Sequence, residues 1–464
     1  MNRLGLARLQ LWWERAFWVI PVLGVVFGIW LNSVVTSFDD WVASLEGVIH
    51  TDVSTGSALS LLGAIGGGMV TFTGFVFSFV VLLLQFGSSQ YSPRTVSHFL
   101  RARSTQVILA IFLATVTFSF LSLLDVGSSG RAQFVPILTI LVAVGLLLLS
   151  LVAFIALLHS VGGRMRVDAV LSSVGRQARQ RLQRRGSLLA GVVTEGEGAA
   201  VFDAVAPLVV RSPRAGQVVA VDLRVLRALA KRRRLRIALR VQVGDAVSEG
   251  SALMRVWTAD GSSAPLKVSG RFAGTVVVDQ ERSLRHDAFY SLRLLVDVAI
   301  RALSPAVNDP TTAVRALDEI EGVLRVAAHR QLGDQRIAAG AGEVIVRIPS
   351  WSDVVLLGLL EIMTFGIGQP QVTRRLMMLL DDLLADVPED RRGELATLRA
   401  SLIRRLEASV ADPEAVRIAL RGDRQGLGGT LVEATVEPAV EPAGETTRST
   451  EAPSKPDDAE LGSE

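Results

Sequence analysis

The N-terminal third of the chain contains long apolar stretches without charged side chains. No Asp, Glu, Lys or Arg lies between Asp52 and Arg94, between Arg103 and Asp125, or between Arg131 and Arg164. A helix needs about 20 mostly apolar residues to cross a bilayer. With a further apolar stretch near the N-terminus, the pattern predicts a transmembrane domain, 16–160, whose four helices cover residues 16–36, 58–87, 106–124 and 135–160.

Basic residues gather on one side of these predicted spans. They precede the first span, lie between the second and third, and follow the fourth: Arg3, Arg8, Arg15, Arg94, Arg101, Arg103, Arg164, Arg166 and Arg176. The two opposite loops hold Asp39, Asp40, Glu46, Asp52 and a single basic residue, Arg131. Because Lys and Arg favour the cytoplasmic side, we expect both termini, including the segment 1–15, in the cytoplasm.

The second predicted span carries a small and polar face. At about 30 residues it is longer than a hydrocarbon core of about 30 Å requires, so we expect it to tilt, to kink at Gly66–Gly68 or to project from the bilayer. With 3.6 residues per turn, one face gathers Gly67, Thr71, Gly74, Ser78 and Gln85. Two interpretations stay open: close packing on another helix, for which Gly63 and Gly67 have suitable spacing, or the lining of a pore.

The predicted spans hold almost no ionisable groups. His159, at the inner end of the fourth span, is the single exception. A proton relay or charge-coupled transport has no residues to use, which disfavours a pump and leaves a passive conduit or an anchor. The hydroxyl groups of Thr115, Ser119 and Ser122 form a stripe on the third span and can bond across helices.

Composition excludes several kinds of chemistry. Half of the 464 residues are hydrophobic (50%), 20% are charged, and none is cysteine, which removes disulfides, Cys-ligated zinc, iron–sulfur clusters and thiol nucleophiles. The five histidines are scattered without the spacing of metal ligands. We therefore expect no metal, no cofactor and no catalytic residue, and we do not expect an enzyme.

The residues after position 160 have the more polar composition of a water-soluble region. A basic helix and linker (161–200) precede a β-rich module (201–285), a mostly helical domain (286–421) and an acidic tail (422–464) with a net charge of −7, from ten acidic and three basic residues. We expect the tail to be disordered. The predicted fold class is a four-span helical membrane domain joined to a cytosolic α+β domain with a C-terminal helical region.

The β-rich module is similar to a known half-repeat. Residues 212–221 and 243–254 resemble the two halves of biotinyl/lipoyl-type barrel-sandwich domains, which carry their prosthetic group on a lysine in an exposed hairpin. Neither Lys231 nor Lys267 lies in such a hairpin. We therefore expect a structural module and not a carrier, with a short helix from Leu223 to Lys231 capped by Asp222.

The same short helix ends in the densest basic patch of the sequence. It consists of Lys231, Arg232, Arg233, Arg234 and Arg236. No interleaved aromatic residue or known motif accompanies it, so nucleic acid is not an expected partner. A solvated or lipid-facing surface and a site for a small anion remain open, with anionic lipid as the candidate partner.

A second candidate site is a corner between two predicted helices. The first helix carries Asp297 and Arg301 at the spacing of an i, i+4 ion pair, and the second begins with Asp309 as N-cap, before Pro310. The corner could be an ordinary capped turn or a site for an anion at a helix N-terminus. We expect it to face Arg94 or a neighbouring subunit. The candidate residues are Arg94, Asp297, Arg301, Asn308, Asp309 and Thr311.

Beyond this corner the pattern predicts a strand and four more helices. The strand covers residues 343–348, and the helices cover 353–364, 371–385, 391–410 and 413–421.

Two long motifs are similar to those of a known family. Residues 73–78 (Thr-Gly-Phe-Val-Phe-Ser) with 88–94 (Ser-Ser-Gln-Tyr-Ser-Pro-Arg) form the first, and residues 297–313, which include Ser304-Pro305 and Asn308-Asp309-Pro310, form the second. Over about residues 21–420 the chain resembles predicted bacterial membrane proteins catalogued as a domain of unknown function. The resemblance implies a multi-pass protein of the bacterial plasma (inner) membrane with four spans and a cytosolic domain, and it supplies no catalytic residues.

These observations favour two functional hypotheses. The first is a homo-oligomeric passive conduit that the second span lines and the cytosolic domain gates. The second is a membrane-anchored sensor or scaffold that binds a partner or a small anion through the cytosolic domain. An enzyme is the weakest hypothesis, because an ion pair and a surface histidine explain the residues near Asp297 without catalysis.

Overall fold

Four helices form the membrane part of the protein. The computed structural model describes residues 18–44, 55–90, 103–128, 137–164, 167–189, 193–194, 206–260, 272–280 and 287–424. Four described helices are long and apolar enough to cross a membrane. They are α2 (Val19–Ser44), α3 (Thr55–Gln90), α5 (Arg103–Ser128) and α6 (Ile137–Arg164). The four membrane helices predicted from the sequence are confirmed, and the second is one continuous helix of 36 residues.

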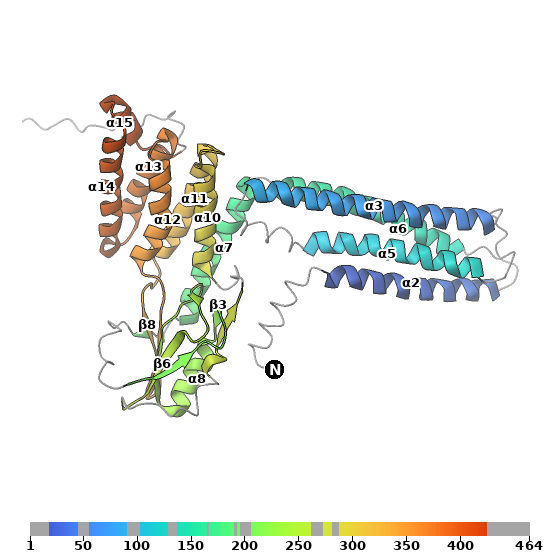
Figure 1. Cartoon of the computed structure of the whole chain (residues 1–464), viewed down its shortest axis with the longest axis horizontal. Helices are drawn as coiled ribbons and strands as arrows, with labels where there is room; N and C mark the ends of the chain where they lie inside the picture. Colours follow the sequence, from blue (N-terminus) through green and yellow to red (C-terminus); the bar gives the residue numbers. More distant parts are fainter. Residues whose placement is uncertain are drawn as a thin grey trace, which may run out of the picture. The chain divides into compact units, whose positions relative to one another are not determined.

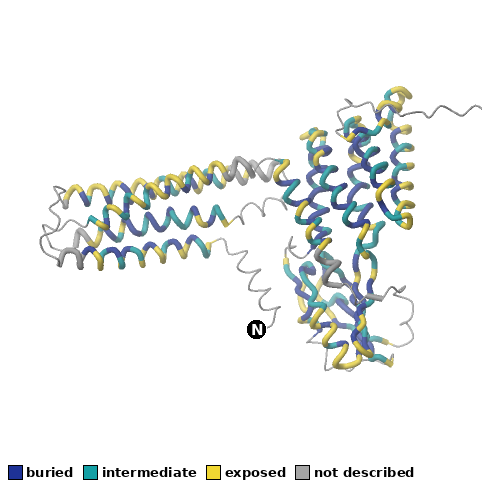
Figure 2. Tube along the Cα trace, turned by 180° about the vertical axis from the view of Figure 1, so that it is seen from behind, coloured by how far each residue is buried: buried dark blue, intermediate teal, exposed yellow. Residues whose placement is uncertain are grey.

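Helix α5 is the centre of this bundle. It contacts α2, α3 and α6, and it lies between α2 and α3 in Figure 1. Phe112 and Phe118 of α5 are fully buried, together with Leu62 of α3 and Ala143 of α6. Outward positions of all four helices are large and apolar, and Figure 2 shows them as exposed. This is the arrangement expected of helices whose outer surface contacts lipid.

Two glycines bring α2 and α5 into close contact. A Cβ at Gly24 would lie 2.3 Å from the carbonyl oxygen of Ala110, and one at Gly28 would lie 2.8 Å from that of Ala114. Both positions are one helical turn apart, the spacing at which small residues let two membrane helices approach. Close helix packing through glycine is therefore a property of the first span.

Polar side chains within the bundle bond from one helix to another. Asn32 of α2 donates to Asp125 at 2.7 Å and accepts from the Ser122 hydroxyl at 2.7 Å. The Thr115 and Ser150 hydroxyls lie 2.9 Å apart and join α5 to α6. The stripe predicted on the third span thus lies in the bundle interior, where Thr115, Ser119 and Ser122 are fully buried.

The β-rich part consists of two small sheets. The six-stranded sheet has the order β1-β8-β9-β4-β6-β2, and the three-stranded sheet has the order β5-β3-β7. Neighbouring strands are antiparallel except β4 and β9, which pair in parallel. The strands are β1 (Val193–Thr194), β2 (Leu208–Arg211), β3 (Gly216–Val221), β4 (Leu235–Leu239), β5 (Ala246–Val247), β6 (Ala252–Thr258), β7 (Val276–Asp279), β8 (Gln335–Ala339) and β9 (Gly342–Val346).

The helix α8 (Leu223–Arg233) covers part of the six-stranded sheet. Asp222 accepts a hydrogen bond from the Val225 amide at 3.1 Å, which confirms the expected cap. Leu226 and Ala230 of α8 are fully buried with Ile237 of β4 and Val344 of β9 in one core. A Cβ at Gly342 would lie 2.4 Å from the Leu235 carbonyl oxygen, so a glycine is required where β9 begins.

The remaining helices form a separate apolar core. They are α7 (Val167–Leu189), α10 (Ala288–Ala302), α11 (Pro310–Ala328), α12 (Trp351–Gly366), α13 (Pro370–Asp386), α14 (Arg392–Ser409) and α15 (Pro413–Leu420). Helices α10 to α13 are largely buried in Figure 2, and α7 adds Leu171, Val174 and Ala178 to their core. The predicted fold class is confirmed: four membrane-length helices precede mixed sheets and C-terminal helices.

Candidate functional site

The small and polar face of α3 points away from the bundle. Gly67, Thr71, Gly74 and Ser78 are exposed, whereas Leu62 and Met69 on the opposite side are buried. The hydroxyls of Thr71 and Ser78 donate to carbonyl oxygens of their own helix, at 3.2 and 3.0 Å. Gln85 is exposed on the same face. The predicted residues therefore share one face of α3, and this face lies on the outer surface of the four-helix bundle.

The glycines of this face differ from those of α2. A Cβ at Gly63, Gly67 or Gly74 would meet no atom within 4 Å among the described residues. Gly24 of α2, by contrast, touches the α5 backbone. Packing within one chain therefore explains the glycine of α2 and leaves the glycines of this α3 face without a neighbour in the described part of the chain.

The predicted corner is a capped turn tied to a second turn. The Asp309 carboxylate accepts from the Thr312 amide at 3.0 Å and from its hydroxyl at 2.6 Å. Asn308 has a φ of 48° and accepts a hydrogen bond from Gln369 at 2.9 Å, which joins the α10–α11 turn to the α12–α13 turn. Because Asp309 occupies the N-terminus of α11, an anion there would meet a carboxylate. Thr311 is exposed beside it.

Other members of the predicted corner lie apart from this turn. Arg94 is outside the described residues. Asp297 accepts from Arg293 at 2.7 Å, and Arg293 also pairs with Glu361 of α12. The pKa of Arg293 is raised, chiefly by its hydrogen bond to Glu361 against the opposing effect of burial. Arg301 belongs to the last turn of α10.

The basic patch lies at the end of α8. Lys231, Arg232, Arg233 and Arg234 are exposed, and Arg234 caps the helix in the left-handed conformation with a φ of 51°. Arg236 of β4 pairs with Glu343 of β9 at 3.5 Å. Four of the five predicted cations are thus presented to solvent, and the fifth is part of a cross-strand pair.

An ion network unites α11 and α13. Arg375, with a side chain only 5% exposed, bonds to Asp318 at 2.8 Å and to Glu321. Burial alone would lower the pKa of Arg375, but its bonds to Glu321 and Asp318 outweigh this and raise it. Its guanidinium therefore stays charged at every ordinary pH. No local sequence pattern predicts this network, because Arg375 is more than fifty positions away from Asp318 and Glu321 in the chain.

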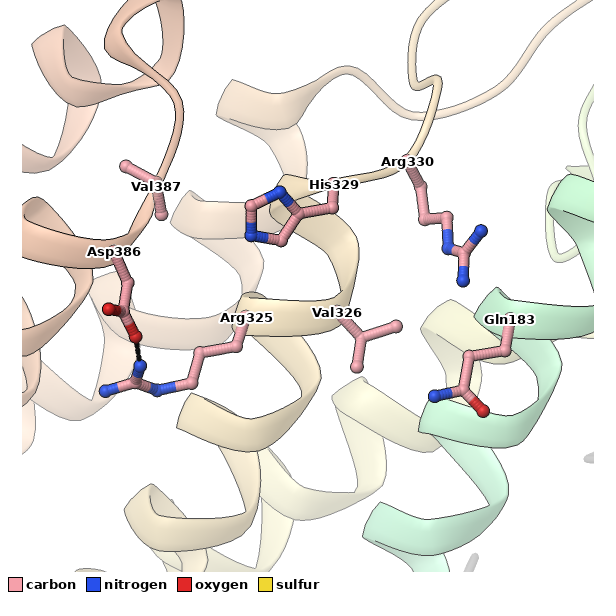
Figure 3. Close-up of a pocket in the computed structure, with 7 residues that line it drawn as sticks. All are labelled: Gln183, Arg325, Val326, His329, Arg330, Asp386 and Val387. Atoms are coloured by element: carbon pink, nitrogen blue, oxygen red, sulfur yellow. Dashed lines mark ion pairs between the residues drawn. The ribbon is translucent and has the colours of Figure 1, made fainter.

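A pocket of about 270 Å³ lies at one end of these helices. Its walls come from α7, α11, α13 and the residues that follow α11 and α13, as Figure 3 shows. They are Gln183, Arg325, Val326, His329, Arg330, Asp386 and Val387. None of these was singled out by sequence, because no motif joins positions so distant in the chain. Among the described residues, no cluster of His, Asp or Glu could hold a metal ion.

Four membrane-length helices joined to a mixed α and β region define a multi-pass membrane protein. The family model described as "Predicted membrane protein (DUF2254)" matches residues 14–382, so the chain belongs to this family. The uncharacterized proteins Mb1321c of Mycobacterium bovis and Rv1290c of Mycobacterium tuberculosis are each 32% identical to it over 417 residues, covering 86% of this chain and 78% of theirs. No solved structure matches the chain.

Proposed function

We propose that this protein is a homo-oligomeric passive conduit of the bacterial plasma membrane, with the outward face of α3 at the subunit interface and along the path. The observation that carries the proposal is the exposed face of Gly67, Thr71, Gly74 and Ser78. Glycine in a helix costs about 1 kcal/mol relative to alanine. A helix surface that contacted only lipid would gain nothing from it.

A second copy of the chain is the occupant that this face suits. Small residues let membrane helices approach closely, and hydroxyl groups can bond across the contact. Larger exposed side chains, Val70, Phe75 and Phe77, flank the small residues on α3 and offer apolar contacts to a neighbour. In a ring of four or more copies, the small and polar face would border a central axis.

The absence of ionisable groups from the centre of the spans supports a passive path. Asp39 and Asp125 lie at the ends of α2 and α5, and His159 lies near the end of α6. Coupled transport ordinarily uses carboxylates or histidines deep within the membrane. We propose that both termini are cytoplasmic, as the distribution of Lys and Arg favours, and that the region after α6 gates the path from that side.

The cysteine-free sequence makes the interface directly testable. Ser78→Cys and Thr71→Cys should each give disulfide-linked dimers in oxidised membranes, and Val152→Cys, at a residue of α6 that is 62% exposed, should not. Vesicles that contain the reconstituted protein should be permeable to small solutes, and cross-linking of the Ser78→Cys protein should change the rate of this solute flux. A monomeric mass in nanodiscs, with equal cross-linking at all three positions, would refute the proposal.

Orientation is tested in the same cysteine-free background. Ala408→Cys, at an exposed position of α14, should be labelled by a membrane-impermeant maleimide only after the cells are opened. Ser129→Cys, in the connection between α5 and α6, should be labelled in intact spheroplasts. The opposite pattern would place the region after α6 outside the cytoplasm and end the gating proposal.

The second candidate function is a membrane-anchored sensor, which the pocket between α7, α11 and α13 supports. A monomer or dimer without solute flux would favour it over the conduit, because too few copies of α3 would be present to surround a path.

A further inference from the structure

The pocket of Figure 3 is formed where three helices meet. Gln183 belongs to α7, Arg325 and Val326 to α11, and Asp386 to the last position of α13. His329 and Arg330 follow directly after α11, and Val387 follows α13. In Figure 3 the Arg330 guanidinium points toward Gln183, and the Arg325–Asp386 pair lies on the other side of Val326. Polar groups thus border an apolar floor.

The two arginines of the pocket differ in how their charge is balanced. Arg325 pairs with Asp386 and with Glu321, the latter at 2.7 Å. Within the part of the chain that the structure describes, no ion pair joins Arg330 to a carboxylate, and its buried Nε has no hydrogen-bond partner. Leaving a buried donor without an acceptor costs about 1–3 kcal/mol. Counting the described residues alone, the pocket therefore carries one positive charge that no carboxylate balances, together with one unused donor.

The end of α11 does not oppose an anion as a helix C-terminus ordinarily would. Arg391 donates to the carbonyl oxygens of Ala327 and Arg330, at 3.1 and 2.7 Å. Its guanidinium also lies 5.5 Å from the centre of the Trp351 ring. Burial lowers the pKa of Arg391, with the charge of Asp390 opposing this effect. A fixed cation therefore satisfies these carbonyl groups and leaves the side chains of His329 and Arg330 available to a ligand.

We propose that this pocket binds a small phosphate monoester. Arg330, His329 and Gln183 are three donors that border one space, which suits the three oxygens of a phosphate better than the two of a carboxylate. Val326 and Val387 give the organic part of the ester an apolar surface. At about 270 Å³ the pocket is close to the lower limit of about 300 Å³ for small-molecule sites, which limits the organic part to a small group.

The test is isothermal titration of the full chain in phosphatidylcholine nanodiscs with phenyl phosphate as the probe. Empty nanodiscs give the background, and phenol and benzoate replace the phosphate group. We expect saturable binding of one phenyl phosphate per chain, with no binding of phenol and weaker binding of benzoate. Benzoate binding as tightly as phenyl phosphate would overturn the assignment to phosphate, and no saturable binding of phenyl phosphate would overturn the site.

Two variants and a matched control locate the binding. Arg330→Gln should weaken it by at least about tenfold, as the loss of a charge-assisted hydrogen bond does. Gln183→Glu, at an exposed position, should weaken it by repulsion without disturbing the core. Arg404→Gln, on the exposed side of α14, should bind as the unchanged protein does. Equal affinity in all of these proteins would place the binding elsewhere and refute the proposal.

The site has a consequence for the conduit, and this part rests on the proposed function. Only residues 165 and 166 separate α6 from α7, so a ligand held between α7 and α11 would act on a helix directly joined to the membrane part. Phenyl phosphate should then change solute flux through the reconstituted protein, and this change should be absent in Arg330→Gln. Binding without any flux would refute the conduit alone, whereas flux without binding would refute the phosphate site alone.

Discussion

Arg375 offers the sharpest test of how the helical core is held together. It lies on α13 and reaches Asp318 and Glu321 of α11, with only 5% of its side chain exposed. Arg375→Met keeps most of the volume and removes the charge. The two carboxylates would then lose their shared partner at a position from which water is largely excluded.

The expected cost follows from the partners that remain. Removing one partner of a buried ion pair ordinarily costs about 3–5 kcal/mol. Glu321 keeps Arg325 at 2.7 Å, and Asp318 keeps Arg315 at 3.2 Å, so the lower end, about 3 kcal/mol, applies. At about 2–4 °C per kcal/mol for a domain of this size, the midpoint of thermal unfolding should fall by about 6–12 °C.

The assay is brief proteolysis of the detergent-purified chain at a series of temperatures, scored by loss of the fragment that contains α10 to α14. Arg399→Met is the matched control, because its pair with Asp381 is 37% and 41% exposed and such pairs contribute about 0–1 kcal/mol. Adding Glu321→Gln to Arg375→Met should restore part of the stability. A shift below about 2 °C in Arg375→Met would show that the buried network does not stabilise the core.

Two further predictions concern the membrane bundle. Gly24→Leu should separate α2 from α5 and lower the yield of monodisperse protein in size-exclusion chromatography, because its Cβ would lie 2.3 Å from the Ala110 carbonyl oxygen. Gly145→Leu is the control and should not lower the yield, because Gly145 has open space around it among the described residues. Equal yields of the two variants would contradict the packing of α2 on α5. Asp39→Ala should lower the stability of the bundle to heat by about 1–2 kcal/mol, because Asp39 of α2 caps α6 by accepting a hydrogen bond from the Thr139 amide at 3.1 Å. Asp39→Asn should lose less stability than Asp39→Ala. An unchanged aggregation temperature would argue against this cap.

Local signals in the sequence predicted most elements well. Asp309 and Pro310 mark the start of α11 because a side-chain cap and a fixed φ act within one turn, and the structure has both. The apolar stretches predicted four membrane helices because length and composition are likewise properties of one continuous segment. The strand β8 escaped prediction, although its antiparallel partner β9 begins only two residues after it; its other partner, β1, lies far away in the chain. Its own five residues, Gln335–Ala339, include two alanines and two polar side chains and show little strand preference.

For the candidate sites, too, local patterns could be predicted and contacts between distant segments could not. Helical periodicity predicted that Gly67, Thr71 and Ser78 share a face of α3, but not which way the face points. That direction depends on the opposite side, where Leu62 and Met69 pack in the bundle. The pocket could not be predicted at all, because Gln183 and Arg330 are brought together only by the packing of α7 on α11.

Helix α7 connects the last membrane helix, α6, to the helices that form the pocket. Its Leu171 and Ala178 lie in the core of the helical region, and Arg179 pairs with Glu319 of α11 at 2.7 Å. Glycines bring the two helices close from both sides: a Cβ at Gly175 would collide with Glu319, and a Cβ at Gly322 would lie 2.8 Å from the Arg179 guanidinium. Helix α7 is therefore fixed to α11 by packing and by charge, while its first turn follows α6 after two residues. Any rearrangement of α11 and α13 must either move α7 or break these contacts, which makes α7 the element through which a ligand in the pocket would reach the membrane.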